Sequence, residues 1–259
     1  MRLTLLGTGT SFGVPQIGCG CAVCRSSDPR DQRSRTAALV ELRGSTLLID
    51  TPPELRLQLL RARPARVDAV LYTHEHADHV AGIDDLRIFS VTRKAPLPVF
   101  ASAGMMGYLR ESYRYIFDHE QEPYAGTSKP RLDLAELVPG RITDVAGVPV
   151  LPLAFAHGHD TVLGFRIGPV AYLTDVKQVP EPERELLRGV EVLVLNALWW
   201  RSHPTHLSIP EAIETARAIG ARRTILTHLT HETGHAELAA RLPQGVEPGF
   251  DGQILEVSR

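Results

Sequence analysis

The chain has 259 residues, of which 43% are hydrophobic and 22% are charged, and its formal net charge is −2. This is the composition of a globular protein with enough chain to bury a sizeable core. It implies no strongly basic surface, although a basic patch is compatible with a balanced total, and we do not expect long nucleic acid as a partner. There is no run of 18 apolar residues to indicate a membrane span, and the N-terminal apolar run is too short for a signal peptide. The simplest expectation is a cytoplasmic protein.

The first half of the chain alternates predicted strands with predicted helices. The hydrophobic pattern predicts strands at 2–6, 36–42, 45–50, 67–73 and 96–102, and helices at 53–62, just after His79, and at 105–117. The residues from 118 to 140 are polar, with Pro and Gly, and show no clear period. We therefore expect residues 105–140 to form an insertion or lid within a single domain that spans 1–259.

The second half repeats this order. The pattern predicts strands at 148–156, 162–168, 170–175, 190–198, 224–229 and 252–257, and helices at 181–188, 208–219 and 235–241. The helix at 208–219 begins with a Ser-x-Pro-Glu capping sequence and ends before Gly220. Two β-rich layers covered by helices predict an α/β fold of the four-layer αββα sandwich type. The early glycines in GTGTSFG do not fit a dinucleotide-binding fingerprint.

The most informative stretch is THEHADH, at residues 73–79. It joins a buried strand to a helix, and such loops often carry chemistry. His74 and His76 alternate along an extended chain, so their side chains can point the same way, while Asp78 and His79 turn toward a second point. Imidazoles and carboxylates at this density suit zinc, manganese or iron. Clustered histidines would cost stability without a metal, so we prefer a metal site to a set of surface histidines.

The H-x-H-x-D-H sequence after a strand resembles the signature of the metallo-β-lactamase superfamily, and the likeness extends along nearly the whole chain. It implies an acidic residue that supports the metal loop through hydrogen bonds, at Asp50. It also implies three further metal ligands that end or follow strands: His157, Asp175 and His228.

The resemblance implies two active-site ions, zinc or manganese. The first would be held by His74, His76, His157 and Asp175, and the second by Asp78, His79, His228 and the same Asp175. His159 lies two residues from His157 and remains an alternative ligand. A pair of ions of this kind activates a bridging water and stabilises the attacking and leaving oxygens.

A further histidine in HPTHLS, at residues 203–208, resembles the non-ligand catalytic histidine of the tRNase Z and PhnP branch. His206 would donate to a phosphoryl oxygen or protonate the leaving oxygen as a general acid. The alternative is that His206 caps or solvates the turn. We group His206, Asp78 and Asp50 as the candidate catalytic residues. We expect His203 to support the site from behind or to face solvent, and His119 and His235 to lie at the surface.

The three cysteines of the chain all lie in GCGCAVC, at residues 18–24. A G-C-x-C-x-x-C sequence resembles the structural zinc loop of PhnP-type phosphodiesterases, in which a histidine three residues after the last active-site ligand completes the site. The resemblance therefore implies one structural zinc on Cys19, Cys21, Cys24 and His231. The alternatives are a redox-sensing cluster and buried free thiols, and a disulfide between Cys19 and Cys21 would be strained.

The function implied by the resemblance is that of a metal-dependent phosphodiesterase. It would act on small or cyclic phosphodiesters through a hydroxide activated by two metals, with no membrane partner and, as one option, as a homodimer. Three alternatives stay open. A tRNase Z-like tRNA 3′-end endonuclease needs a basic arm that the sequence lacks, and a lactone or thioester hydrolase requires neither His206 nor the cysteine loop. A PqqB-like protein would be non-catalytic.

Overall fold

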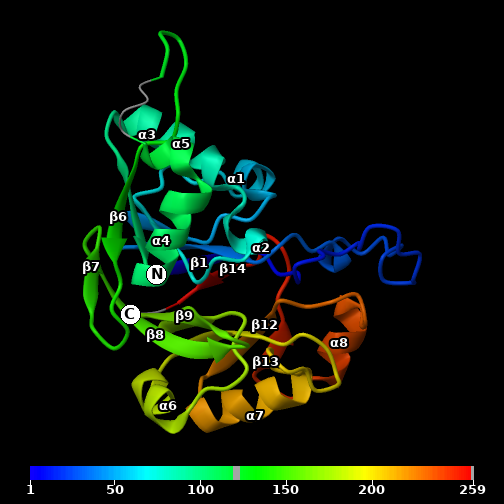
Figure 1. Cartoon of the computed structure of the whole chain (residues 1–259). Helices are drawn as coiled ribbons and strands as arrows, with labels where there is room; N and C mark the ends of the chain where they lie inside the picture. Colours follow the sequence, from blue (N-terminus) through cyan, green and yellow to red (C-terminus); the bar gives the residue numbers. More distant parts are fainter. Residues whose placement is uncertain (119–122, 258–259) are drawn as a thin grey trace.

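The structure, a computed structural model, describes residues 1–118 and 123–257. Two seven-stranded sheets lie face to face and are covered by helices on their outer sides. Figure 1 shows these sheets between one layer that holds α1, α3, α4 and α5 and another that holds α6 and α7. This arrangement confirms the predicted four-layer αββα sandwich. None of the described helices is long and apolar enough to cross a membrane.

The first sheet is built mainly from the N-terminal half of the chain. Its spatial order is β14 (Ile254–Glu256), β1 (Arg2–Gly7), β2 (Ala37–Leu42), β3 (Ser45–Ile49), β4 (Ala69–Leu71), β5 (Leu97–Ala101) and β6 (Leu132–Glu136). The helices of this half are α1 (Leu55–Ala62), α2 (Ala77–Val80), α3 (Arg87–Arg93), α4 (Ala103–Ser112) and α5 (Arg114–Phe117), with 3₁₀ turns at Pro29–Asp31 and Ile83–Leu86.

The second sheet comes from the C-terminal half. Its spatial order is β13 (Val246–Pro248), β12 (Arg223–Thr227), β11 (Val192–Asn196), β10 (Val170–Leu173), β9 (Asp160–Ile167), β8 (Val148–His157) and β7 (Thr143–Val145). The helices of this half are α6 (Glu181–Leu187), α7 (Ile209–Ile219) and α8 (His235–Arg241). As the sequence predicts, α7 begins with a complete capping box between Ser208 and Glu211.

The central strands of both sheets are buried on two faces. In β11, Val192 and Val194 point into the core between the sheets, whereas Leu193 and Leu195 pack in the core beneath the outer helices. This follows from the alternation of side chains along a strand. It explains why the central strands appear in the sequence as nearly continuous apolar runs.

The structure differs from the expected insertion at 105–140. Residues 132–136 form β6, which pairs in parallel with β5 at the edge of the first sheet. An edge strand has one neighbour and is half exposed, so LDLAE lacks the apolar run of a central strand. Helix α4 also packs Met105 and Leu109 into the core against that sheet. The short strands β7 and β13 were missed for the same reason as β6.

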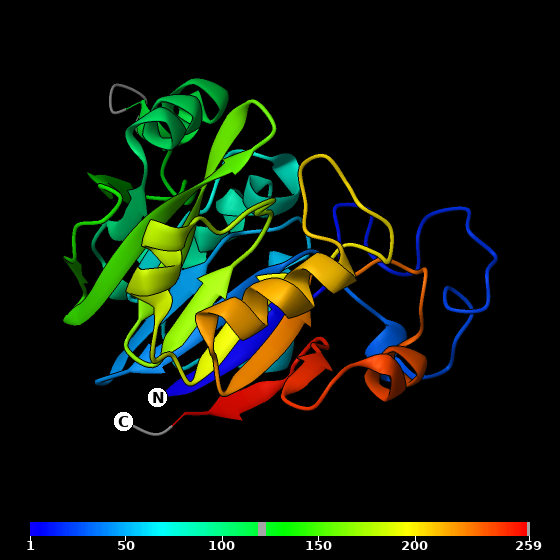
Figure 2. The same ribbon diagram turned by 90° about the horizontal axis from the view of Figure 1, so that it is seen from below.

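A long loop between β1 and β2 carries the cysteines. Figures 1 and 2 show it projecting from the body of the molecule on the side where α8 lies. One isolated bridge, between Gly9 and Arg35, joins the two ends of this loop, and another joins Gly9 to Leu229, which follows β12. The loop, which connects two strands of the first sheet, is therefore also fastened to the second half of the sandwich.

Candidate functional site

The site residues follow the ends of strands from both sheets. Asp50 comes directly after β3, His228 directly after β12, and Asp175 lies two residues beyond β10. All three have positive φ angles, of 61°, 58° and 59° respectively. The left-handed region is unfavourable for residues other than glycine, and such strain gathers at functional sites. The fold therefore holds these three side chains in place at a cost in backbone energy.

The structure brings the predicted metal-binding side chains together. Their nitrogen and oxygen atoms form overlapping groups within 4.8 Å of one another: His74, His76 and His157; His74, His79 and Asp175; Asp78, His79 and His228. His157 is the member that meets His74 and His76. The alternative, His159, is exposed and lines the adjoining pocket without joining a group.

Asp50 sets the orientation of two of these histidines from behind. Its carboxylate is fully buried and accepts hydrogen bonds from His79 Nδ1 at 2.7 Å, from the Thr73 backbone N–H at 2.9 Å and from the Thr73 hydroxyl at 2.8 Å. The Thr73 oxygen in turn accepts from His74 Nδ1 at 2.9 Å. With Nδ1 as the donor in both rings, the Nε2 atom of each faces the site, where it can serve as a metal ligand. Asp50 thus positions ligands rather than touching a substrate.

The third orienting contact comes from a backbone group. His157 Nδ1 donates to the carbonyl oxygen of Thr205 at 3.2 Å, which turns its Nε2 toward His74 and His76. The sequence analysis missed this role of Thr205. A backbone carbonyl leaves no trace in the residue type, so only the position next to His206 could have suggested it.

The donor set fits divalent ions. Nε2 of His79 and both ring nitrogens of His228 are buried and have no hydrogen-bond partner among the described residues. His79 Nε2 lies 3.3 Å from Asp175 and 3.4 Å from Asp78, and His228 Nε2 lies 3.1 Å from Asp175. Buried, unpaired nitrogens that converge with carboxylate oxygens are costly unless a cation binds them.

The directions of the pKa shifts of Asp175 and His79 also favour a cation at this point. Burial raises the pKa of Asp175, but His228 and His79 outweigh it and hold the pKa well below its usual range. Burial lowers the pKa of His79, and the Asp175 and Asp50 carboxylates reverse this and raise it well above its usual value. The carboxylates thus favour positive charge at this point, and a divalent ion would supply it in place of protons.

His206 is not among the predicted ligands, but it forms a further group within 4.8 Å with His157 and Asp175. Its Nε2 is 2.9 Å from Asp175 Oδ1, and its Nδ1 is 2.9 Å from the Thr205 hydroxyl and 3.2 Å from His203 Nδ1. Burial lowers the pKa of His206, an effect that its hydrogen bond with Asp175 opposes. His203 therefore contacts the candidate general acid from behind, which is one of the two places expected for it.

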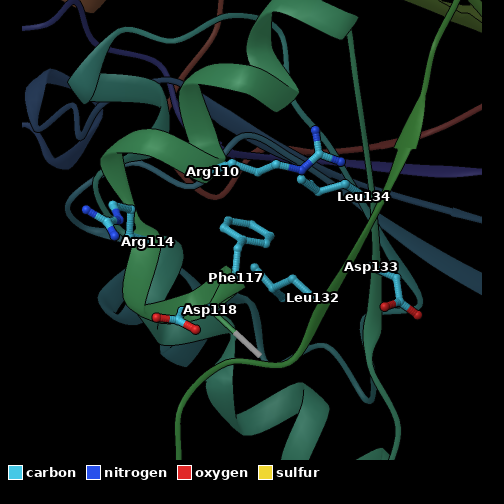
Figure 3. A pocket seen from close by; sticks show the side chains of 7 residues that line it. All are labelled: Arg110, Arg114, Phe117, Asp118, Leu132, Asp133 and Leu134. Atoms are coloured by element: carbon cyan, nitrogen blue, oxygen red, sulfur yellow. The ribbon is translucent and has the colours of Figure 1, made fainter. Parts of the chain in front are cut away.

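A pocket of about 320 Å³ opens over these groups. It is lined by Ser11, by residues 158–160, by the Thr205–His206 turn and by five of the predicted ligands: His76, Asp78, His157, Asp175 and His228. A larger hollow of about 660 Å³ lies between α4–α5 and β6, where Arg110 and Arg114 surround Phe117 (Figure 3). It contains no residue of the metal-binding cluster, so we place the chemistry in the smaller pocket.

The cysteines meet His231 as the sequence suggested. The Sγ atoms of Cys19, Cys21 and Cys24 lie 3.4, 3.3 and 3.5 Å from His231 Nδ1, and all three thiols are free. A tetrahedral zinc with bonds of about 2.1 to 2.3 Å has sulfur–nitrogen edges of roughly 3.6 Å. A backbone hydrogen bond from Cys24, helped by His231, lowers the pKa of Cys21 to about 6, while burial raises that of Cys24 to about 11. The cluster has the donors and spacing of a closed zinc site.

One prediction about histidines was wrong. His235, expected at the surface, is 6% exposed. Its backbone N–H donates to Asp31 at 2.6 Å, and its ring lies 3.4 Å from the buried guanidinium of Arg33. These partners are more than 200 residues away in sequence, so local patterning could not reveal them. His119 lies outside the described residues.

Comparison with known proteins decides the family. A family profile described as a beta-lactamase superfamily domain matches residues 45–229, which include the whole predicted active-site ligand set. The chain belongs to the metallo-β-lactamase superfamily.

Individual relatives narrow the placement within this superfamily. A crystal structure of a diphosphatase from the PhnP family superposes with a TM-score of 0.90 at 37% identity, covering 99% of this chain and 98% of that one. Zinc-bound PqqB from Methylobacterium extorquens shares the fold, with a TM-score of 0.79 at 18% identity over 99% of this chain and all of that one. These likenesses identify a PhnP-like metallo-β-lactamase protein.

A curated relative carries a different name. An octanoyltransferase from Porphyromonas gingivalis is 42% identical over 255 residues, which are 97% of this chain and 51% of that protein. The chain therefore spans about half the length of this relative. The activity of that longer protein cannot be carried over to a chain that matches half of it.

Proposed function

We propose that this protein is a metal-dependent phosphodiesterase that acts on small or cyclic phosphodiesters. The observation that carries the proposal is that Nε2 of His206, which we assign as a non-ligand histidine, lies 2.9 Å from Oδ1 of Asp175, the carboxylate predicted to be shared by the two ions. Its support is the 37% identity to a PhnP-family diphosphatase along nearly the full length of both chains. A lactone or thioester hydrolase of this superfamily does not require a histidine at this place.

The predicted ligands fall into two sets, one for each ion. His74, His76 and His157 would hold one ion, and Asp78, His79 and His228 would hold the second, with Asp175 shared. When bound, such ions lower the pKa of water and neutralise charge that develops on phosphoryl oxygens.

His206 would act on the far side of the reacting phosphorus. A ring nitrogen beside the shared carboxylate is placed to donate a hydrogen bond to a phosphoryl oxygen or a proton to the leaving oxygen. Contacts of its Nδ1 with Thr205 and His203 hold the ring in that orientation. A phosphodiester with an alkoxide leaving group needs this proton most.

A substrate panel tests the proposal. Purified protein loaded with zinc or manganese is offered bis-p-nitrophenyl phosphate, 2′,3′-cyclic nucleotides, a lactone, a thioester and a precursor tRNA. We expect turnover of the first two classes. Turnover of the lactone or thioester alone, of the precursor tRNA alone, or of none of the panel would overturn the proposal.

A further inference from the structure

The loop that carries His206 spans residues 199–208 and is closed at a neck, where its two ends meet. Backbone hydrogen bonds join Leu198 N–H to the Leu207 carbonyl at 2.9 Å and Ile209 N–H to the Trp199 carbonyl at 2.8 Å, and these close the neck. Between these two hydrogen bonds the chain forms a loop that places two groups in the site. These are the His206 ring and the Thr205 carbonyl, which orients the ligand His157. A shift of this loop would therefore disturb a metal ligand and the candidate general acid together.

The start of this loop, directly after the neck, is held by the segment that carries His231. Glu232 Oε2 accepts from the Trp200 backbone N–H at 3.0 Å, and its Oε1 accepts from the Arg201 guanidinium at 2.9 Å. The next residue, Thr233, accepts from the Trp200 indole N–H at 2.9 Å. His231 faces the cysteines while the two residues after it grip the His206 loop.

Ring contacts continue from this grip to the active site. The Arg201 guanidinium lies 3.6 Å from the centre of the Trp199 ring, and that ring meets His203 edge-on with centroids 5.2 Å apart. His203 in turn lies 3.2 Å from His206. An unbroken path of contacts therefore runs from Glu232 to the candidate general acid.

The main contacts between the two segments are the hydrogen bonds from the Trp200 backbone N–H to Glu232 and from the Trp200 indole N–H to Thr233. Arg201 is 63% exposed, so its ion pair with Glu232 contributes little by itself. A carboxylate that accepts a backbone N–H makes a stronger, charge-assisted bond, and Thr233 is buried. Losing the carboxylate frees the Trp200 backbone at the start of the loop.

We propose that Glu232 is a positioning residue that couples the cysteine and His231 cluster to the His206 loop. Together with Thr233 it holds Trp200 and Arg201. The cysteine and His231 cluster would then fix the position of the proposed general acid, His206, as well as that of His228. The kinetic part rests on the proposed phosphodiesterase function, whereas the coupling of the two loops does not.

Kinetics of Glu232 variants test the positioning role. We expect Glu232→Ala to lower kcat for a 2′,3′-cyclic nucleotide about tenfold, a fraction of the roughly 10²- to 10⁴-fold that a general acid contributes. It should affect bis-p-nitrophenyl phosphate much less, because that leaving group needs little protonation, and should leave KM nearly unchanged. Glu232→Gln keeps an oxygen for the Trp200 N–H and should recover most of the loss. Glu247→Ala, which breaks a similar surface ion pair with Arg223, is the matched control.

Tryptophan fluorescence tests the coupling without any turnover. The two tryptophans of the chain, Trp199 and Trp200, both lie in this loop, so emission from selectively excited tryptophan reports on the loop. We expect an emission change in Glu232→Ala and in Cys21→Ser, none in Glu247→Ala, and no further change when the first two are combined, because coupled sites are not additive.

The outcomes separate the two proposals. Glu232→Ala that matches Glu247→Ala in emission and in both kcat values would overturn the positioning role. Emission changes that add in the double variant would overturn the coupling. If the wild type turns over neither phosphodiester, the proposed function fails, and the emission comparison alone still decides the coupling.

Discussion

At the scale of single residues, His206 carries the most specific chemical assignment. Replacing it with Ala removes the proton donor but none of the predicted ligands. We expect kcat for a 2′,3′-cyclic nucleotide to fall about 10²-fold or more, as for the loss of a general acid. Elemental analysis should find the same number of metal ions as in the wild type. If the variant retained full activity, His206 would not be the general acid and would only cap or solvate its turn.

His235 makes a prediction about pH. Burial, followed by the positive charges of Arg33 and Arg30, lowers its pKa from 6.5 to about 4. Between these values the unfolded chain binds a proton that the folded protein does not. The free energy of unfolding should therefore fall as the pH drops from about 6.5 toward 4, by up to about 1.4 kcal/mol per pH unit from this group.

Urea denaturation across this pH range measures the effect. His235→Asn retains an oxygen that can accept from Arg33 and has no titrating group, so its free energy of unfolding should depend less on pH in this window. An identical pH dependence in both proteins would contradict the assignment.

At the scale of elements, the cysteine loop is the clearest case of a segment that supports another. His231 lies three residues after His228, and Leu229 between them forms a bridge with Gly9 of the cysteine loop. We expect Cys21→Ser to lower the bound zinc by about one ion per chain and to weaken the active-site ions as well. Elemental analysis after dialysis is the measurement, and a metal count equal to that of the wild type would count against a structural zinc.

Much of the architecture was accessible from the sequence because the central strands are buried on both faces. VEVLVLNAL and VDAVLYT are apolar runs that only a covered strand explains. The strands β6, β7 and β13 escaped because they lie at sheet edges or are three residues long. An edge strand such as LDLAE is specified by its partner β5, which lies 35 residues earlier in the paired register, and not by its own pattern.

The candidate ligands of the site could be predicted from the sequence because their residue types and positions are distinctive. The dense THEHADH motif identifies itself, and the remaining ligands follow strand ends in recognisable places. The backbone carbonyl of Thr205 and the grip of Glu232 on Trp200 could not be predicted. Both depend on contacts between segments that meet only in the folded chain.

At the scale of the whole molecule, the candidate metal centre joins the two halves of the sandwich. Asp50 and residues 74–79 come from the first half, whereas His157, Asp175 and His228 come from the second. An ion bound to both halves stabilises the folded state, by about 2.7 kcal/mol when its concentration is 100 times the dissociation constant.

Thermal unfolding with and without metal tests this linkage. We expect a chelator to lower the Tm, and zinc or manganese added in excess to restore it. An unchanged Tm in protein shown by elemental analysis to have lost its ions would mean that the two halves hold together without them.

The central claim is that metal ions at this centre make the protein a phosphodiesterase. The most direct measurement is the rate of bis-p-nitrophenyl phosphate hydrolysis as zinc or manganese is added back to chelated protein, with bound metal counted at each point. The account predicts no turnover without metal and a rise that is complete at two ions per chain beyond the one held by the cysteines. Full turnover by metal-free protein, or no turnover at any loading, would contradict it.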